Sequence, residues 1–248
     1  MGDAVVDGLD GPALAGRFGL PACEVHARVE STMDVAHAAA DRGAPAGTLI
    51  IADEQSTGRG RGGRRWSSRP GDGLWMTLIE RPRSPQGLEV LSLRIGLHLA
   101  EALDSLAGEP VRLKWPNDLH LAGGKLAGIL IEARWRDQRV EWVAIGVGLN
   151  VLPAADVPLS AGLAPGTTRL QALAAAVPAM RAAAAVEHSL TAEELARYRR
   201  RDLGVGRRII EPAVGVVVGV GATGDLIVDT AAGSVSCRAG SLVFAEDR

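Results

Sequence analysis

An arginine- and glycine-rich run at residues 58–65, GRGRGGRR, carries four guanidinium groups, and no acid lies between Glu54 and its end. Glycines let backbone amides approach a ligand closely, and a concave row of amides binds anions. Arginine binds carboxylate or phosphate through paired hydrogen bonds. Trp66, which follows the run, offers a flat face to a base. The run lacks the Lys-Ser/Thr of a Walker A loop and the spacing of a dinucleotide-binding turn. The alternative to an anion site is a solvated surface loop.

A carboxylate and a lysine lie seven residues apart in the segments KWPND (114–118) and GGKLAGILIE (123–132). We expect Asp118 on a loop and Lys125 at the mouth of a strand. Placed together over a phosphate, the lysine would neutralise charge, and the acid would hold the lysine or a hydrated cation. A surface salt bridge is the commoner interpretation of an isolated pair. The nearby arginine run favours a functional site.

The segment 139–151 is expected to form a strand with one apolar face and one face of very small side chains. Alternate residues of a strand point to opposite faces, and glycine inside a strand costs stability. A row of small residues ending in an amide predicts that another group presses closely on that face, although packing against a helix would also explain it. The apolar face is Val143, Ile145, Val147 and Leu149, and the small face is Ala144, Gly146, Gly148 and Asn150.

Helices and strands alternate along the part of the chain that must position these groups. A helix is expected over 31–42, because a serine–threonine pair can cap it and alanines dominate it. A second helix over 88–106 has apolar residues at helical spacing. An alanine-rich helical region over 152–203 is expected to break at Pro178 and to end in a capped helix, TAEELARYRRR. Strands are expected over 47–53, 73–80, 111–115, 125–136 and 139–151.

Three regions are expected along the chain. Residues 1–22 are rich in Gly, Ala and Asp and are predicted to form a loose N-terminal arm. Residues 23–203 carry the motifs described above, in a sheet covered by helices. Residues 204–248 hold short valine-rich runs separated by GATGD and AAGS, which is typical of a small antiparallel barrel.

The composition disfavours several classes of function. A chain of 248 residues with 47% hydrophobic residues supports a core, and a net charge of −2 argues against a general nucleic-acid binder. An RNA-binding module using the arginine run and RYRRR (197–201) is therefore disfavoured, since RYRRR is typical of a helix end that complements its own dipole. Cys23 and Cys237 form no CxxC, and the five histidines show no ligand spacing, so no protein metal site is predicted. The absence of a signal peptide and of a long apolar run predicts a cytoplasmic protein.

Five motifs occur together in this chain: STM (31–33), EQSTGRGRGGRRW (54–66), KWPND (114–118), GGKLAGIL (123–130) and IGVGLN (145–150). In this order and spacing they resemble the catalytic domain of biotin–protein ligases, the biotin–[acetyl-CoA-carboxylase] ligases. The resemblance covers residues ~23 to 203, and the C-terminal region resembles the small SH3-like domain of that family. It implies an α+β fold with a mixed sheet covered by helices. It also implies a monofunctional ligase, because ~22 upstream residues cannot fold the winged-helix repressor domain of some members.

The resemblance implies a two-step reaction. The carboxylate of biotin attacks the α-phosphate of ATP, which gives biotinyl-5′-adenylate and pyrophosphate. A lysine of a biotin carboxyl carrier domain then attacks the mixed anhydride and releases AMP. The phosphates of ATP would bind Mg²⁺ and carry it into the site. Cations must screen the repulsion between the two anionic substrates. No DNA or membrane partner is implied.

Residue roles are carried over position by position. The resemblance implies that Lys125 stabilises charge on the α-phosphate, that Arg61 bridges that phosphate and the biotin carboxylate, and that Asp118 supports Lys125 or the metal. The biotin-binding set would be Ser31, Thr32, Met33, Gln55, Gly58, Arg59, Gly60, Arg61 and Lys125. The nucleotide-binding set would be Arg61, Arg64, Trp66, Asn117, Lys125 and Asn150, with Trp66 stacked on adenine.

One position departs from the family pattern, and two other functions are weighed. Met33 stands where the family often has asparagine, and core packing is its simpler interpretation. A lipoate–protein ligase would share the fold, but the arginine run with KWPND favours biotin. A non-catalytic sensor of biotin or nucleotide is disfavoured, because Lys125 and Arg61 are both present.

Overall fold

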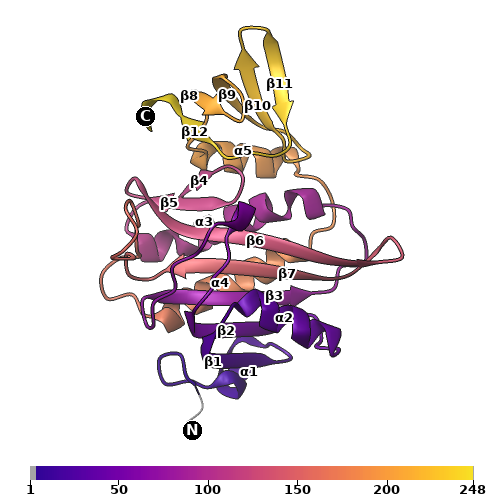
Figure 1. Cartoon of the computed structure of the whole chain (residues 1–248), viewed down its shortest axis with the longest axis vertical. Coiled ribbons are helices and arrows are strands. Elements are labelled where there is room, and N and C mark those ends of the chain that lie inside the picture. The colour runs from indigo at the N-terminus through magenta and orange to yellow at the C-terminus, as the bar shows by residue number, and fades with distance from the viewer. Residues whose placement is uncertain (1–3, 248) are drawn as a thin grey trace.

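The computed structural model describes residues 4–247 and contains two β-sheets stacked along the long axis of the molecule (Figure 1). The large sheet has seven strands in the order β1-β2-β3-β7-β6-β5-β4, in which β1 and β2 are parallel and the other neighbours antiparallel. The predicted mixed sheet is thus confirmed. Its strands are β1 (Cys23–Val29), β2 (Thr48–Gln55), β3 (Gly73–Glu80), β4 (Arg112–Lys114), β5 (Asp118–Leu121), β6 (Gly124–Arg136) and β7 (Arg139–Asn150).

The helices cover both faces of the large sheet. Ile50 and Ile79 pack on alanines of α2, whereas their neighbours Leu49 and Leu78 belong to the cluster formed with α3 and α4. Strands buried on both faces need continuous apolar runs, which explains TLIIA in β2 and LWMTLI in β3. The helices are α1 (Gly11–Phe18), α2 (Thr32–Asp41), α3 (Leu91–Ala107), α4 (Arg169–Ala184) and α5 (Ala192–Arg201). None of the helices in residues 4–247 is long and apolar enough to span a membrane.

Capping side chains begin α2 and α5, two of the helices that the sequence predicted. The Ser31 hydroxyl accepts a hydrogen bond from the backbone N–H of Met33 at the start of α2. Thr191 and Glu194 form a capping box at the start of α5. Each side chain satisfies a backbone donor that has no partner within the helix.

Pro178 does not break α4, so that expectation was wrong. Pro178 and Ala174, whose carbonyl loses its helical partner, both lie on the exposed side of the helix. The lost hydrogen bond therefore faces water, while the buried side of α4 keeps its packing on α3. The segment before α4, 152–168, is also not helical, and its three prolines account for this.

The predicted loose arm is partly ordered. Residues 11–18 form α1, which the Asp10 carboxylate caps by accepting from the N–H of Ala13. Leu14 of this helix is completely buried in the main core. The composition suggested a loose segment, but the capping residue and one apolar anchor suffice to dock a short helix.

A five-stranded antiparallel sheet follows α5, in the order β11-β10-β9-β8-β12. It lies at the opposite end of the molecule from the N-terminus (Figure 1). This sheet contacts the large one through the Trp115 indole, which donates to the carbonyl of Gly224 at 3.0 Å. Its strands are β8 (Arg208–Glu211), β9 (Gly215–Val220), β10 (Leu226–Thr230), β11 (Gly233–Cys237) and β12 (Val243–Phe244).

Asp202 lies at the junction between α5 and this second sheet. Its surroundings indicate that the free energy of unfolding depends on pH. One carboxylate oxygen accepts from the N–H of Gly204 at 2.7 Å, and the other is buried with no partner among the described residues. Burial raises the pKa of Asp202 to about 6. A raised pKa stabilises the fold at low pH, and this contribution is lost as the pH rises through 6.

Asp202→Asn is therefore expected to stabilise the fold at pH 8 by on the order of 1 kcal/mol, and by less at pH 5. Urea denaturation of both proteins at the two pH values measures the difference. An equal effect at pH 5 and pH 8 would contradict the assignment to this carboxylate.

Candidate functional site

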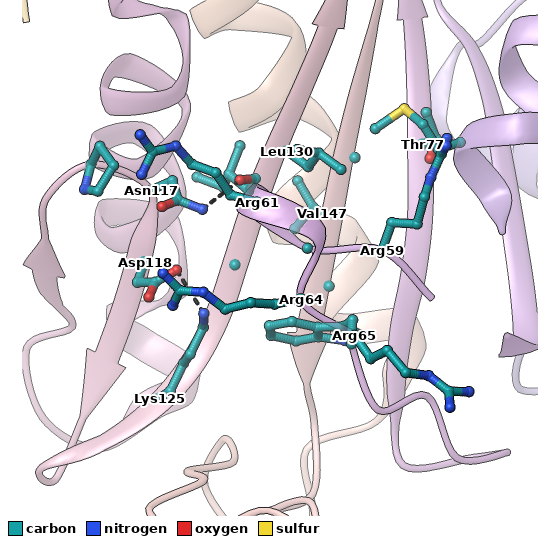
Figure 2. A pocket seen from close by; sticks show the side chains of 18 of the residues that line it. Arg59, Arg61, Arg64, Arg65, Thr77, Asn117, Asp118, Lys125, Leu130 and Val147 are labelled. Carbon is teal, nitrogen blue, oxygen red and sulfur yellow. Dashed lines mark hydrogen bonds and ion pairs between the residues drawn. The ribbon is translucent and has the colours of Figure 1, made fainter. Parts of the chain in front are cut away.

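One cavity brings together residues from most of the predicted motifs (Figure 2). Its floor is formed by β6 and β7, and its walls by the start of α2, the arginine loop and the turn between β4 and β5. Of the predicted site residues, those that line it are Ser31, Thr32, Met33, Gln55, Arg59, Gly60, Arg61, Arg64, Trp66, Asn117, Asp118 and Lys125.

At the α2 end of the cavity, hydroxyl and amide groups form a hydrogen-bonded chain. The Thr77 hydroxyl donates to that of Thr32 at 2.9 Å, and Thr32 donates to the Gln55 amide oxygen at 3.1 Å. The Gln55 amide nitrogen donates to the hydroxyl of Ser68 at 2.9 Å. We call Thr77, Thr32, Gln55 and Ser68 the polar chain. Buried polar groups aligned in this way can recognise a ligand that carries both donors and acceptors.

Thr77 and Ser68 were missed by the sequence analysis. Thr77 is completely buried, and it is the one polar residue in the apolar run of β3. An isolated threonine in such a run could have drawn attention to it. Ser68 carries no comparable signal, because its role depends on how the arginine loop returns to the sheet.

Trp66 and Met33 explain the small face of β7. A Cβ built on Gly148 would lie 2.4 Å from the Trp66 ring, and one built on Gly146 would lie 2.7 Å from the Met33 Cε. Gly128 on β6 is also covered by Trp66, at 2.8 Å. The predicted close approach is thus made by two side chains of the site and not by a helix. Met33 is buried, as its packing interpretation required, and also lines the cavity.

Lys125 and Asp118 meet at the other end of the cavity. The lysine Nζ lies 2.7 Å from the aspartate Oδ1, and 5.1 Å from the centre of the Trp66 ring. The hairpin of β5 and β6 makes this possible, since it pairs Asp118 with Gly128 and His120 with Lys125. Lys114 and Lys125 are the two lysines of the 248-residue sequence, and both line this cavity.

The arginine loop folds as a short hairpin. The Trp66 N–H donates to the carbonyl of Gly58 at 2.8 Å, and the Gly60 N–H donates to that of Arg64 at 2.7 Å. Gly62 turns the chain with a φ of 69°, a conformation that favours glycine. Gly58 does not line the cavity but packs against the returning strand of the loop, where a Cβ would lie 2.6 Å from the Trp66 carbonyl oxygen.

The arginines of the loop point in different directions. Arg61 donates to the carbonyl of Gly240 and Arg64 to the hydroxyl of Ser241, both at 2.5 Å. Figure 2 shows these two extending toward the side of the cavity that holds Asp118 and Lys125, and Arg65 extending the opposite way. Ser241 and Leu242 thus bring the second sheet to the cavity wall. No motif or spacing in the sequence indicated this contact.

The two asparagines lie in different places. The Asn117 amide donates to the carbonyl of Ile129 at 2.8 Å and lines the main cavity. Asn150 does not, because its amide donates to the Lys125 carbonyl at 3.2 Å and to the Ser160 hydroxyl at 3.0 Å. It lines an adjoining hollow that shares Arg65, Trp66 and Lys125 with the main cavity. Trp66 therefore lies between the two spaces and lines both. Within residues 4–247, no three His, Cys, Asp or Glu residues are grouped to hold a metal ion.

Comparison with known proteins identifies the family. The family model described as "Biotin/lipoate A/B protein ligase family" matches residues 25–150. The biotin–[acetyl-CoA-carboxylase] ligase of Mycobacterium tuberculosis is 31% identical over an alignment of 221 residues, gaps included, and the match covers 79% of this chain and 79% of that protein. This chain belongs to the biotin/lipoate A/B protein ligase family.

Other relatives agree with this placement. The bifunctional ligase/repressor BirA of Bacillus spizizenii is 42% identical over 129 residues, which is 52% of this chain and 40% of that protein. The chain thus spans less than half the length of this relative. The structure of the biotin protein ligase from Aquifex aeolicus in complex with biotin and ATP has a TM-score of 0.74. It is 24% identical and covers 90% of this chain and 99% of that chain. The likeness confirms the predicted α+β fold.

Proposed function

We propose that this family member is an ATP-dependent biotin–protein ligase. The observation that carries the proposal is one cavity with opposite chemistry at its two ends. Thr77, Thr32 and Gln55 of the polar chain line one end, and Lys125, Arg61 and Arg64 surround the other. Such a cavity fits a substrate with a polar, uncharged head and a carboxylate that must meet a phosphate.

The polar chain favours biotin over lipoate. A ureido ring carries N–H donors and a carbonyl acceptor, which the hydroxyls of Ser31 and Thr32 and the amide of Gln55 can satisfy. A dithiolane ring offers no such partners, so buried polar groups would be left without hydrogen bonds. The loop residues Arg59 and Gly60 would close over this head.

The cationic end would bring the two anionic substrates together. Arg61 would bridge the biotin carboxylate and the α-phosphate, and Lys125 would stabilise the charge that grows on that phosphate during attack. One carboxylate oxygen of biotin forms the new bond to phosphorus, and pyrophosphate leaves. Asp118 holds the Lys125 ammonium in place through their 2.7 Å contact.

Trp66 would hold the nucleotide base. Because its ring lines both the main cavity and the adjoining hollow, adenine can stack on it while the phosphates reach Lys125. Asn150 and Val157 would line the base site from the hollow, and Asn117 would lie near the nucleotide. Mg²⁺ would arrive with ATP, since this ion is held mainly by phosphates and water with one carboxylate, and Asp118 is the acid that lines the cavity.

The second step would transfer biotin to a lysine of a biotin carboxyl carrier domain, with release of AMP. The lysine amine attacks the acyl carbon of the adenylate, and the bond to the AMP oxygen breaks. We propose that residues 23–203 form the catalytic domain, that 204–248 form an SH3-like domain, and that the reaction takes place in the cytoplasm.

A thermal-shift comparison tests the choice of vitamin. Biotin with ATP is expected to raise the melting temperature, because a ligand at about 100 times its Kd stabilises the native state by roughly 2.7 kcal/mol. Lipoate with ATP is expected to raise it no further than ATP alone does. Biotin-dependent exchange of pyrophosphate into ATP then tests turnover. A shift with lipoate alone, or no exchange with folded protein, would contradict the proposed function.

A further inference from the structure

Arg59 differs from the other arginines of the loop, because acidic side chains of the large sheet and its helix hold it. Its Nη2 lies 2.7 Å from the Asp34 Oδ1 and 3.5 Å from the Glu132 Oε2. The same Glu132 oxygen lies 2.9 Å from the His37 Nε2. The other His37 nitrogen, Nδ1, accepts a hydrogen bond from the Trp142 indole at 3.0 Å. These contacts link the loop to α2, β6 and β7.

The indole fixes which nitrogen of His37 carries the proton. An indole N–H can only donate, so Nδ1 must accept and must carry no proton. A neutral imidazole then carries its proton on Nε2, which is the nitrogen that faces Glu132. His37 therefore donates to the same carboxylate oxygen that faces Arg59. That hydrogen bond orients the carboxylate toward the loop.

The far end of this arrangement is rigid. Trp142 is 5% exposed and packs in the core formed with α2. The guanidinium of Arg81 lies 5.7 Å above its ring and donates to the carbonyls of Ala40 and Glu141. Because Trp142 is packed in the core, its indole N–H holds the His37 ring in one orientation. At the other end, the Arg59 side chain is 42% exposed and belongs to a glycine-rich loop.

A single exposed ion pair would hold Arg59 weakly, since its side chain loses entropy and solvent screens the charge. Two carboxylates from different elements restrict it more, because the second contact costs less entropy once the first is made. Asp34 and His37 are three residues apart on α2 and so lie on the same side of that helix. The helix that begins with Ser31 and Thr32 thus also supplies the partners of the loop.

We propose that Asp34, Glu132 and His37 are positioning residues that hold Arg59 over the head end of the cavity. Their effect on biotin rests on the proposed function. They raise the affinity for biotin and take no part in the transfer to phosphate. Their effect on the loop itself is independent of any ligand.

Three variants and one matched control test the proposal. His37→Phe removes both hydrogen bonds, whereas His37→Gln can keep the donor toward Glu132. Glu132→Gln removes the charge from a partly exposed position and serves as a second disruption. His26→Phe is the control, because His26 pairs with Glu24 at 3.2 Å on β1 and is similarly exposed, but does not line the cavity.

The first measurement uses no ligand. Amide hydrogen exchange of residues 56–66 is expected to become faster in His37→Phe and Glu132→Gln, and to stay at the wild-type rate in His37→Gln and His26→Phe. Unchanged exchange in both disrupting variants would overturn the proposal. Faster exchange in a protein that binds no biotin would support the positioning contacts while refuting the proposed function.

The second measurement separates affinity from turnover. His37→Phe is expected to raise the Kd for biotin about fivefold, the scale of a partly exposed charge network, and to leave the pyrophosphate exchange rate at saturating biotin unchanged. In an Arg59→Gln background, His37→Phe is expected to have no further effect on the Kd. A full fivefold effect in that background, or a loss confined to the rate, would show that His37 acts elsewhere.

Discussion

Lys125→Ala is expected to lower the rate of biotin-dependent pyrophosphate exchange at saturating biotin by about 10²–10³-fold, as the loss of one preorganised electrostatic contact does. Lys125 lies at the cationic end of the cavity, where charge grows on the α-phosphate in the proposed reaction. Its ammonium is oriented by Asp118 and lies over Trp66. The contact forms mainly in the transition state, so the Kd for biotin is expected to change much less than the rate.

Lys114→Ala is the matched control for this prediction. Lys114 is the second lysine of the chain, lines the same cavity and lies 5.1 Å from the Phe244 ring of the second sheet. Lys114→Ala removes the same charge from the cavity. It is expected to lower the rate less than about tenfold, because Lys114 makes a less specific electrostatic contact with the reacting phosphate. Equal losses in the two variants, or a Lys125→Ala loss that appears only in the Kd, would contradict the catalytic role of Lys125.

Gly148→Ala is expected to weaken nucleotide binding by about 10–100-fold, the scale of one lost base-stacking contact. The new methyl group would lie 2.4 Å from the Trp66 ring, so the indole must leave the small face of β7. The ring then no longer offers its face to adenine. Calorimetry with ATP measures the loss, and indole fluorescence follows the displacement of Trp66.

Two other glycines supply the controls. Apart from the flexible Met33 Cε, Gly146→Ala meets nothing closer than 3.4 Å, and Gly96→Ala in α3 meets nothing closer than 3.5 Å. Both are expected to bind ATP nearly as tightly as the wild type, and Gly96→Ala is expected to favour the helix. A nucleotide affinity for Gly148→Ala within twofold of the wild type would show that Trp66 does not hold the base.

The sequence predicted those parts of the fold that depend on local pattern. β3 occupies residues 73–80 as predicted, because an apolar run interrupted only by Thr77 and bounded by glycine and arginine leaves few alternatives. The start of α2 followed from a capping serine. The errors at α1 and Pro178 have a common cause. In each case tertiary packing outweighed a local preference, and the position of the core cannot be read from a short window.

The candidate site, like the fold, was predicted where local sequence pattern determines it and missed where tertiary packing does. The arginine loop, Lys125 and Asp118 were found because their residue types are unusual at their spacing. Ser241 was not, because it reaches the cavity through the packing of a separate sheet. The contact of His37 with Glu132 joins residues 95 positions apart, and only the register of the sheet with α2 brings them together.

The confinement of both lysines to the cavity has a consequence for chemical selectivity. An acyl adenylate reacts with free amines, whereas an arginine guanidinium remains protonated and is a poor nucleophile. Outside the cavity, every lysine or arginine position of the 248-residue sequence is an arginine, so none of these side chains carries a primary amine. In the proposed reaction, an activated biotin that escaped before transfer would therefore find few side chains of this protein to modify, and a carrier lysine would face little competition.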